Sequence, residues 1–211
     1  MEADWPLIAV RFALYATLSG LFGLSAFSLY GLKAGERGAS VALRSWLAGS
    51  GLLGLLLSGI AIAVLAASMA GAPAWPVDGE AIGMLLTGSA TGKAWKVRIG
   101  ALVIASIIAL IERGRAVLLG LVALMGATAL ATLAWTGHGA MDDGAIGWAH
   151  LLADIMHLLA AGAWIGGLVV DSPLGLPATP WVGAVLVAGA LGLTVWSSAL
   201  DRRPRQALQT A

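Results

Sequence analysis

The stretch WLAGSGLLGLLLSGIAIAVLAASMA, residues 46–70, contains no charged side chain and decides the fold class. A helix of this length crosses the roughly 30 Å hydrocarbon core of a bilayer, since each residue adds about 1.5 Å. Similar apolar runs occur at about residues 6–31, 97–111, 116–135, 147–170 and 181–199. The sequence therefore predicts an all-α, polytopic transmembrane helical bundle with about six transmembrane helices.

The composition of the whole chain agrees with a membrane protein. Of 211 residues, 59% are hydrophobic and 11% are charged, and the mean hydropathy is +0.91. Soluble domains carry about 25% charged residues, so these charges are too few to cover a soluble surface. The net charge of +1, without any basic run, indicates no nucleic-acid partner. The chain has no cysteine, which excludes disulfides, thiolate metal sites and cysteine nucleophiles.

The third predicted span is the shortest. Only 13 residues separate Arg98 from Glu112, which is about 20 Å of helix. Such a span crosses the bilayer only if Lys96, Arg98 and Arg113 extend their charged ends toward the headgroups. Residues 80–92 are apolar but too short to cross, and they favour a short interfacial helix or a loop.

Glycines gather at several places within the predicted spans. Small residues let membrane helices approach closely, so these clusters are candidate contact faces between helices. They are Gly20 and Gly23; Gly49, Gly51 and Gly54; and Gly162, Gly166 and Gly167.

Basic residues in the loops predict the orientation. Segment 32–45 carries Lys33, Arg37 and Arg44, and segment 112–115 carries Arg113 and Arg115. Short loops rich in Lys and Arg face the cytoplasm, so residues 1–5 and 137–146 are expected on the outer side. Lys93, Lys96 and the basic tail at 201–205 do not follow this pattern.

Two formal charges, Arg11 and Asp154, fall inside the predicted spans and away from their ends. A charge at the centre of a bilayer costs roughly 2.5–3.5 kcal/mol even on a lenient scale, so such residues usually face the bundle interior. The two have opposite signs and lie in the outer half of the predicted topology. We therefore expect Arg11 and Asp154 to share a buried polar network.

The three histidines are the candidate metal ligands. His138 follows the fourth predicted span, and His150 and His157 lie on the fifth. Because seven residues return to nearly the same side of a helix, His150, Asp154, His157 and Trp164 form one stripe. The two histidines of the stripe are about 10 Å apart along the axis, too far to share one metal ion. His138 and His150 form the easier pair.

Several readings of this stripe remain open. Imidazole suits copper, zinc, iron and nickel, and the thioether of Met141 would favour Cu(I). Alternatively, Asp154 orients a neighbouring histidine in a purely structural packing seam. A haem b oxidoreductase needs histidines on facing helices, whereas His150 and His157 share one helix. We expect no enzyme activity and no catalytic residues. Hydrolytic chemistry in particular is disfavoured, because no Ser–His–acid set stands out, no paired carboxylates lie in a predicted span and the HExxH motif is absent.

Four sequence motifs resemble the copper resistance D family (CopD domain) of bacterial inner-membrane proteins. They are GHG at 137–139, HLLADIMHLLAAGAWIGGL at 150–168, TGKAWKVR at 91–98, and the opening from Trp5 through Arg11 to Tyr15. The resemblance covers about residues 5–170. It implies a CopD-like transmembrane domain at 1–170. The chain leaves the family pattern after Val170, and its own sequence predicts a loop, a last transmembrane helix and a short basic tail at 171–211.

The resemblance also implies a function. Members of the family handle copper between periplasm and cytoplasm, often beside a small periplasmic copper-binding partner of the CopC type. His138, His150, Asp154, His157 and Trp164 fall on the family pattern. The expected protein is a multi-pass inner-membrane protein of copper homeostasis, with its N-terminus in the periplasm.

Within this reading, we expect copper to bind near the outer face between His138 and His150. Met141 or the pair Asp142 and Asp143 would be further ligands. His157 would be a deeper second position, oriented by Asp154. Trp164, one further step inward, would close the stripe as an apolar plug.

Overall fold

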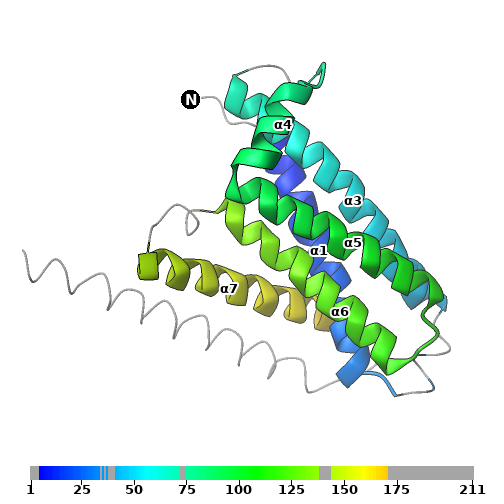
Figure 1. Ribbon diagram of the computed structural model, residues 1–211. Helices are drawn as coiled ribbons and strands as arrows, with labels where there is room; N and C mark the ends of the chain where they lie inside the picture. The colour runs from blue at the N-terminus through cyan, green and yellow to red at the C-terminus, as the bar shows by residue number, and fades with distance from the viewer. Residues whose placement is uncertain are drawn as a thin grey trace, which may run out of the picture.

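The computed structural model describes residues 5–33, 35, 37, 41–71, 75–137 and 144–170, and this part of the chain is helical without any strand (Figure 1). Five of its helices are long and apolar enough to cross a membrane. The predicted all-α bundle is thus confirmed, while the sixth predicted span at 181–199 lies outside the described residues. The helices are α1 (Trp5–Tyr30), α3 (Val41–Ala70), α4 (Gly79–Gly88), α5 (Ala90–Ile111), α6 (Ala116–Ala131) and α7 (Gly144–Val170), with a 3₁₀ helix η1 (Thr132–Thr136) continuing α6.

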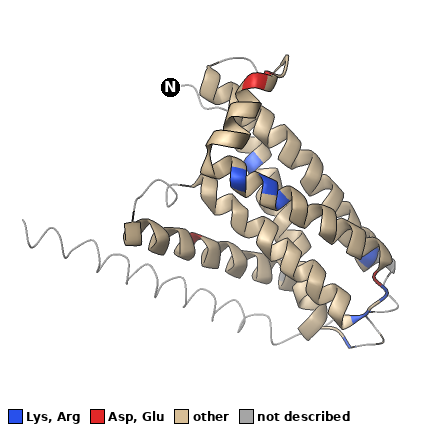
Figure 2. Ribbon diagram, in the orientation of Figure 1, with Lys and Arg blue, Asp and Glu red and all other residues tan. Residues whose placement is uncertain are grey.

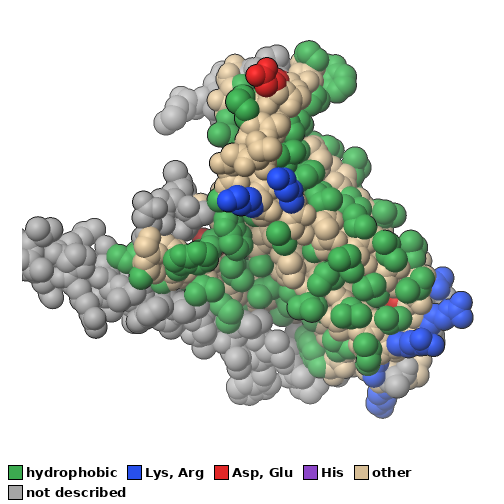
Figure 3. Space-filling model, in the orientation of Figure 1, with side chains coloured by type: hydrophobic (Ala, Val, Ile, Leu, Met, Phe, Trp, Pro, Cys, Tyr) green, Lys and Arg blue, Asp and Glu red, His purple; other side chains and the backbone are tan. Residues whose placement is uncertain are grey.

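Helix α1 is the centre of the bundle. It packs against α3, α6 and α7, while α5 packs against both α3 and α6. Their contacts are made by fully buried leucines, including Leu18 and Leu21 of α1, Leu102 of α5 and Leu119 of α6. Apolar side chains also cover most of the outer surface seen in Figure 3. A surface of this kind suits a bilayer, whose core offers no hydrogen-bond partners.

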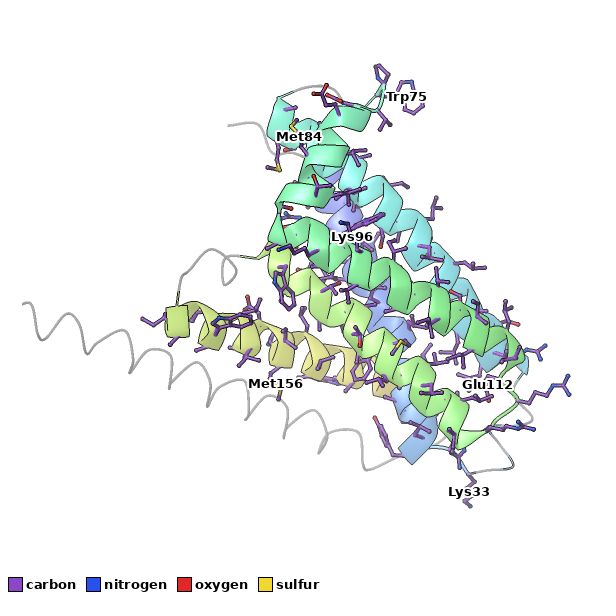
Figure 4. All side chains as sticks on the ribbon, viewed as in Figure 1. Lys33, Trp75, Met84, Lys96, Glu112 and Met156 are labelled. Atoms are coloured by element: carbon purple, nitrogen blue, oxygen red, sulfur yellow. The ribbon has the colours of Figure 1, made fainter. Side chains whose placement is uncertain are left out.

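Helix α5 begins earlier than the sequence predicted, and the predicted third span of 97–111 is wrong at its start. The Ser89 hydroxyl caps the helix by accepting a hydrogen bond from the Gly92 N–H at 2.9 Å. The resulting 22-residue helix is about 33 Å long, enough to cross. Lys93 and Lys96 are exposed, and Figure 4 shows Lys96 in the first half of α5. Their charged ends can therefore reach the headgroups.

Arg98 corrects a second expectation, namely that Arg11 and Asp154 are the only charges within the spans. Its side chain is only 5% exposed and points into the bundle. A charged residue at the start of the apolar run 97–111 therefore did not mark the boundary of the membrane helix, since α5 already begins at Ala90.

Residues 80–92, for which the sequence favoured a short helix or a loop, form the helix α4 as far as Gly88 and the first turn of α5 from Ala90. Asp78 caps α4, because its carboxylate accepts hydrogen bonds from the N–H groups of Glu80 and Ala81 at 2.9 and 3.1 Å. Figure 1 shows α4 at one end of the bundle, beside the beginning of α1, and we call this the α4 end.

The opposite end, which we call the basic end, holds the turn between α5 and α6. Gly114 has φ of +76°, a left-handed conformation that favours glycine. Its N–H donates to the carboxylate of Glu112, which is 2% exposed. Lys33 and Glu112 both lie at this end in Figure 4, and Figure 2 shows Lys and Arg residues gathered there.

Three glycines, Gly23, Gly162 and Gly166, form the crossing between α1 and α7. All three belong to the glycine clusters that the sequence offered as candidate contact faces. A Cβ added to Gly23 would collide with the carbonyl oxygen of Gly162 and lie 2.7 Å from the Gly166 nitrogen. Backbone therefore meets backbone at this point. Gly20 takes no part, since a Cβ there would have nothing within 4 Å. In Figure 1 the beginning of α7 diverges from α6.

Candidate functional site

The polar stripe of α7 lies on one uninterrupted helix. His150, Asp154 and His157 keep their spacing of four and seven residues, so they share one side, and the two histidines are about 10 Å apart along the axis. His150 and Asp154 are partly buried, whereas His157 is exposed. Met156 points from another side of α7 (Figure 4). The stripe thus offers imidazole and carboxylate groups at two depths along the helix.

The Asp154 carboxylate lies against the end of η1. A Cβ added to Gly137 would be 3.5 Å from Asp154 Oδ2. The end of η1 is also held beside the first turn of α5, because the Thr91 hydroxyl donates to the Trp135 carbonyl at 3.2 Å. Since Gly137 directly precedes His138 in the sequence, the chain leaves η1 toward His138 from a point close to Asp154.

Other predicted ligands are not placed by the structure. His138, Met141, Asp142 and Asp143 lie outside the described residues, so their role as copper ligands with His150 stays a prediction. Within the described residues, no group of three or more His, Asp or Glu side chains could hold a metal ion.

The predicted partnership of Arg11 with Asp154 is not formed as an ion pair. In the described part of the chain, no salt bridge joins these two residues. Arg11 instead lines a small cavity between α1, α3, α5 and η1, together with Arg98. Thr136 lines the cavity, and the next residue in the chain, Gly137, lies against the Asp154 carboxylate.

Trp164 lies near the crossing of α7 with α1 but on its outward side. Gly162 and Gly166 are buried there, whereas the Trp164 side chain is 58% exposed. Its predicted role as a plug inside the bundle stays a prediction.

Two methionines near the α4 end were not singled out by sequence reasoning. Met69, in the last turn of α3, and Met84 of α4 line one open hollow of about 380 Å³. Their side chains are 71% and 63% exposed, and Figure 4 shows Met84 on α4. Thioether sulfur is a ligand for Cu(I). The sequence carried no signal for this pair, because only the return of α4 toward α3 brings the two residues to one hollow.

The buried position of Arg98 was not predicted from the sequence either. Arg98 belongs to the TGKAWKVR motif and was assigned to the edge of a short span. Its burial could have been suspected only from the Ser89 cap, which starts the helix two turns before it.

Comparison with known proteins gives a consistent result. A family model described as copper resistance protein D-like, N-terminal domain, matches residues 1–148. A curated relative, copper resistance protein D of Pseudomonas syringae pv. tomato, is 47% identical over 165 residues, which cover 77% of this chain and 53% of the relative. The chain thus spans about half the length of this relative. No solved structure matches it. With more than half of its residues matched by the family model, the chain belongs to the copper resistance protein D family.

Proposed function

We propose that the protein serves copper homeostasis in the bacterial inner membrane by binding copper ions and moving them along the polar side of α7. The observation that carries the proposal is the arrangement of His150, Asp154 and His157 on one helix, with Asp154 against Gly137. This arrangement brings the residue that precedes His138 next to the stripe. The name of the Pseudomonas syringae relative, copper resistance protein D, supports copper as the ion.

The first copper position is formed by His138 and His150, with Met141 or the carboxylates of Asp142 and Asp143 completing the ligand set. Six residues, 138–143, separate Gly137 at the end of η1 from Gly144 at the start of α7. His138 therefore directly follows, in the sequence, the residue that lies against Asp154. Imidazole, carboxylate and thioether together suit copper.

The second position is His157, about 10 Å further along α7. Asp154 is three residues from His157 and four from His150, so its carboxylate can accept a hydrogen bond from either imidazole. A carboxylate in that place orients the ring of a metal-binding histidine. His150 and His157 are too far apart to bind one ion together. They would therefore be two successive binding positions, and copper would move from one to the other.

Copper would arrive at the α4 end. Met69 and Met84 line an exposed hollow there and offer thioether ligands to Cu(I). A small periplasmic partner of the CopC type would deliver its copper to this end. The α4 end is therefore the periplasmic end, the N-terminus is periplasmic, and the basic end faces the cytoplasm.

The orientation can be tested with single cysteines, since the chain has none of its own. A cysteine at position 140 should react with an impermeant thiol reagent in intact spheroplasts, and one at position 113, exposed in the turn between α5 and α6, only after permeabilisation. The reverse pattern would overturn the proposed orientation.

The copper site can be tested by metal analysis and growth. His138→Ala and His150→Ala should each lower the copper content of the purified protein and change copper-dependent growth, while the variants still insert and fold. Trp148→Ala, an exposed position on the same helix, is the matched control and should keep its copper. Full copper binding in both histidine variants would refute the outer site, and a wild-type protein without copper would refute the function. A Soret absorption band would instead favour the haem b alternative.

A further inference from the structure

Within the residues that the structure describes, Arg98 is a buried charge without a counter-charge. Its side chain is 5% exposed, and its Nε has no hydrogen-bond partner. An arginine side chain stays protonated under all ordinary conditions. A guanidinium inside a membrane bundle needs a partner of opposite charge, because the surrounding lipid and apolar side chains cannot solvate it. Within the described residues, no carboxylate forms an ion pair with Arg98.

A cavity of about 30 Å³ adjoins this guanidinium near the α4 end of the bundle. Its polar lining comes from three elements: Arg11 and Tyr15 of α1, Thr91 and Arg98 of α5, and Thr136 of η1. The rest of the lining is apolar, and no acidic residue of the described chain belongs to it. Two arginine side chains therefore line one small space.

Hydrogen-bond donors exceed acceptors in this cavity. The Thr91 hydroxyl already donates to the Trp135 carbonyl at 3.2 Å, and the Thr136 hydroxyl donates to the Leu133 carbonyl at 2.7 Å. Each threonine can then only accept further bonds. The N–H groups of Arg11 and Arg98 and the phenol of Tyr15 remain as donors. The space between them is positively charged and rich in donors.

We infer that this cavity binds a small monovalent anion of halide size, such as chloride, between Arg11 and Arg98. A cavity of this size holds only a few water-sized particles, too few for a phosphate or an organic acid. Hydrogen bonds from guanidinium groups to an anion are charge-assisted and therefore strong. The anion supplies the counter-charge that Arg98 otherwise lacks and ties α1 to α5.

The anion site is separate from the proposed copper path. Two positive side chains repel a copper cation, and the histidines of α7 do not line the cavity. Chloride binding is tested without copper, so a negative result leaves the proposed copper function untouched. A failure of the copper test likewise leaves the chloride site untouched.

The test measures thermal unfolding of the purified full chain in lipid nanodiscs, with a chelator present. Chloride is titrated against gluconate at constant ionic strength, and unfolding is followed by the fluorescence of the nine tryptophans. We expect a saturable rise of the midpoint temperature with chloride, and the same rise with bromide. Equal unfolding curves in chloride and gluconate would overturn the inference.

Variants locate the site. Arg98→Gln should abolish the chloride response, and Arg11→Gln should raise the half-saturating chloride concentration at least about tenfold, since one charge-assisted contact is lost. Lys96→Gln, an exposed position on α5, is the matched control and should keep the response. If Arg98→Gln does not fold, Arg98→Lys replaces it and should also weaken chloride binding.

Two outcomes of the variant series would overturn the inference. One is a full chloride response in both Arg11→Gln and the Arg98 variant. The other is a chloride response that is absent in the wild type and present in Asp154→Asn. Asp154 would then be the counter-charge of the arginines in the wild-type protein.

Discussion

The bundle of α1, α3, α5 and α6 differs from α7 in how its helices are held. In the most apolar stretch of α6, 44% of the residues are buried, compared with 22% in α7. Interlocking leucines join the four helices of the bundle, whereas α7 packs mainly against α1 alone, with Gly23, Gly162 and Gly166 at their closest approach. His150 and His157, two of the candidate copper ligands, lie on the half of α7 before that crossing.

This difference separates stability from function within one fold. Membrane helices gain little from burying apolar surface, because lipid is as apolar as the core, so packing contacts decide how firmly they associate. Each of the four helices packs against at least two others, whereas α7 has one main neighbour, α1. A change at the crossing should therefore act on the placement of the whole of α7 and displace His150 and His157.

The largest effect is expected from Gly23→Ala. Its Cβ would collide with the backbone of α7, which cannot move aside as a side chain can. The loss in free energy of unfolding should therefore exceed about 1–3 kcal/mol, the usual cost of overpacking a core. Gly20→Ala is the matched control. It has open space and should stabilise α1 by about 0.5–1 kcal/mol, as alanine favours helices over glycine. Unfolding in a denaturing detergent measures both, and effects of equal sign would contradict the role of the crossing.

A smaller effect is expected from Leu102→Ala in the core. Leu102 is fully buried between helices, and its truncation should cost about 2–3 kcal/mol, at the low end of the usual range because lipid reduces the transfer part. Trp164→Ala on α7 removes a larger side chain that is 58% exposed, yet it should cost less than about 1 kcal/mol. The same unfolding assay compares the two. A greater loss for Trp164→Ala would show that α7 is packed as firmly as the core.

A loss of about 1 kcal/mol is expected from Trp95→Phe. The indole Nε1 of Trp95 donates to the Ser58 carbonyl at 2.8 Å and thereby ties α5 to α3. Trp46→Phe, whose indole is 67% exposed, is the control and should change the free energy of unfolding by less than about 0.5 kcal/mol. Similar losses in the two variants would argue that this hydrogen bond adds nothing to the bundle.

The smallest effect is expected for the interaction free energy between Arg11 of the bundle and Asp154 of α7. The two form no ion pair in the structure, so the changes Arg11→Leu and Asp154→Leu should add to within about 0.5 kcal/mol in a double-mutant cycle at fixed chloride. A coupling above about 1 kcal/mol would show that the pair forms in the membrane, as the sequence suggested.

The long helices could be predicted because their cause is local. A run of apolar residues in the length range of a bilayer forms a helix that satisfies its own backbone, wherever its neighbours lie. The error at α5 had a local cause as well. Lys93, Lys96 and Arg98 looked like the boundary of a span, whereas Ser89 caps a helix that contains all three.

The candidate site divides in the same way. The sequence by itself determined the helices, the stripe of His150, Asp154 and His157, and the kinds of ligand it offers, since helical periodicity fixes them. Only the tertiary structure decided that Gly23 meets Gly166, that Asp154 lies against Gly137, and that Arg98 shares a cavity with Arg11. These contacts join residues far apart in the chain, and they depend on how whole helices cross, which no local pattern of residues records.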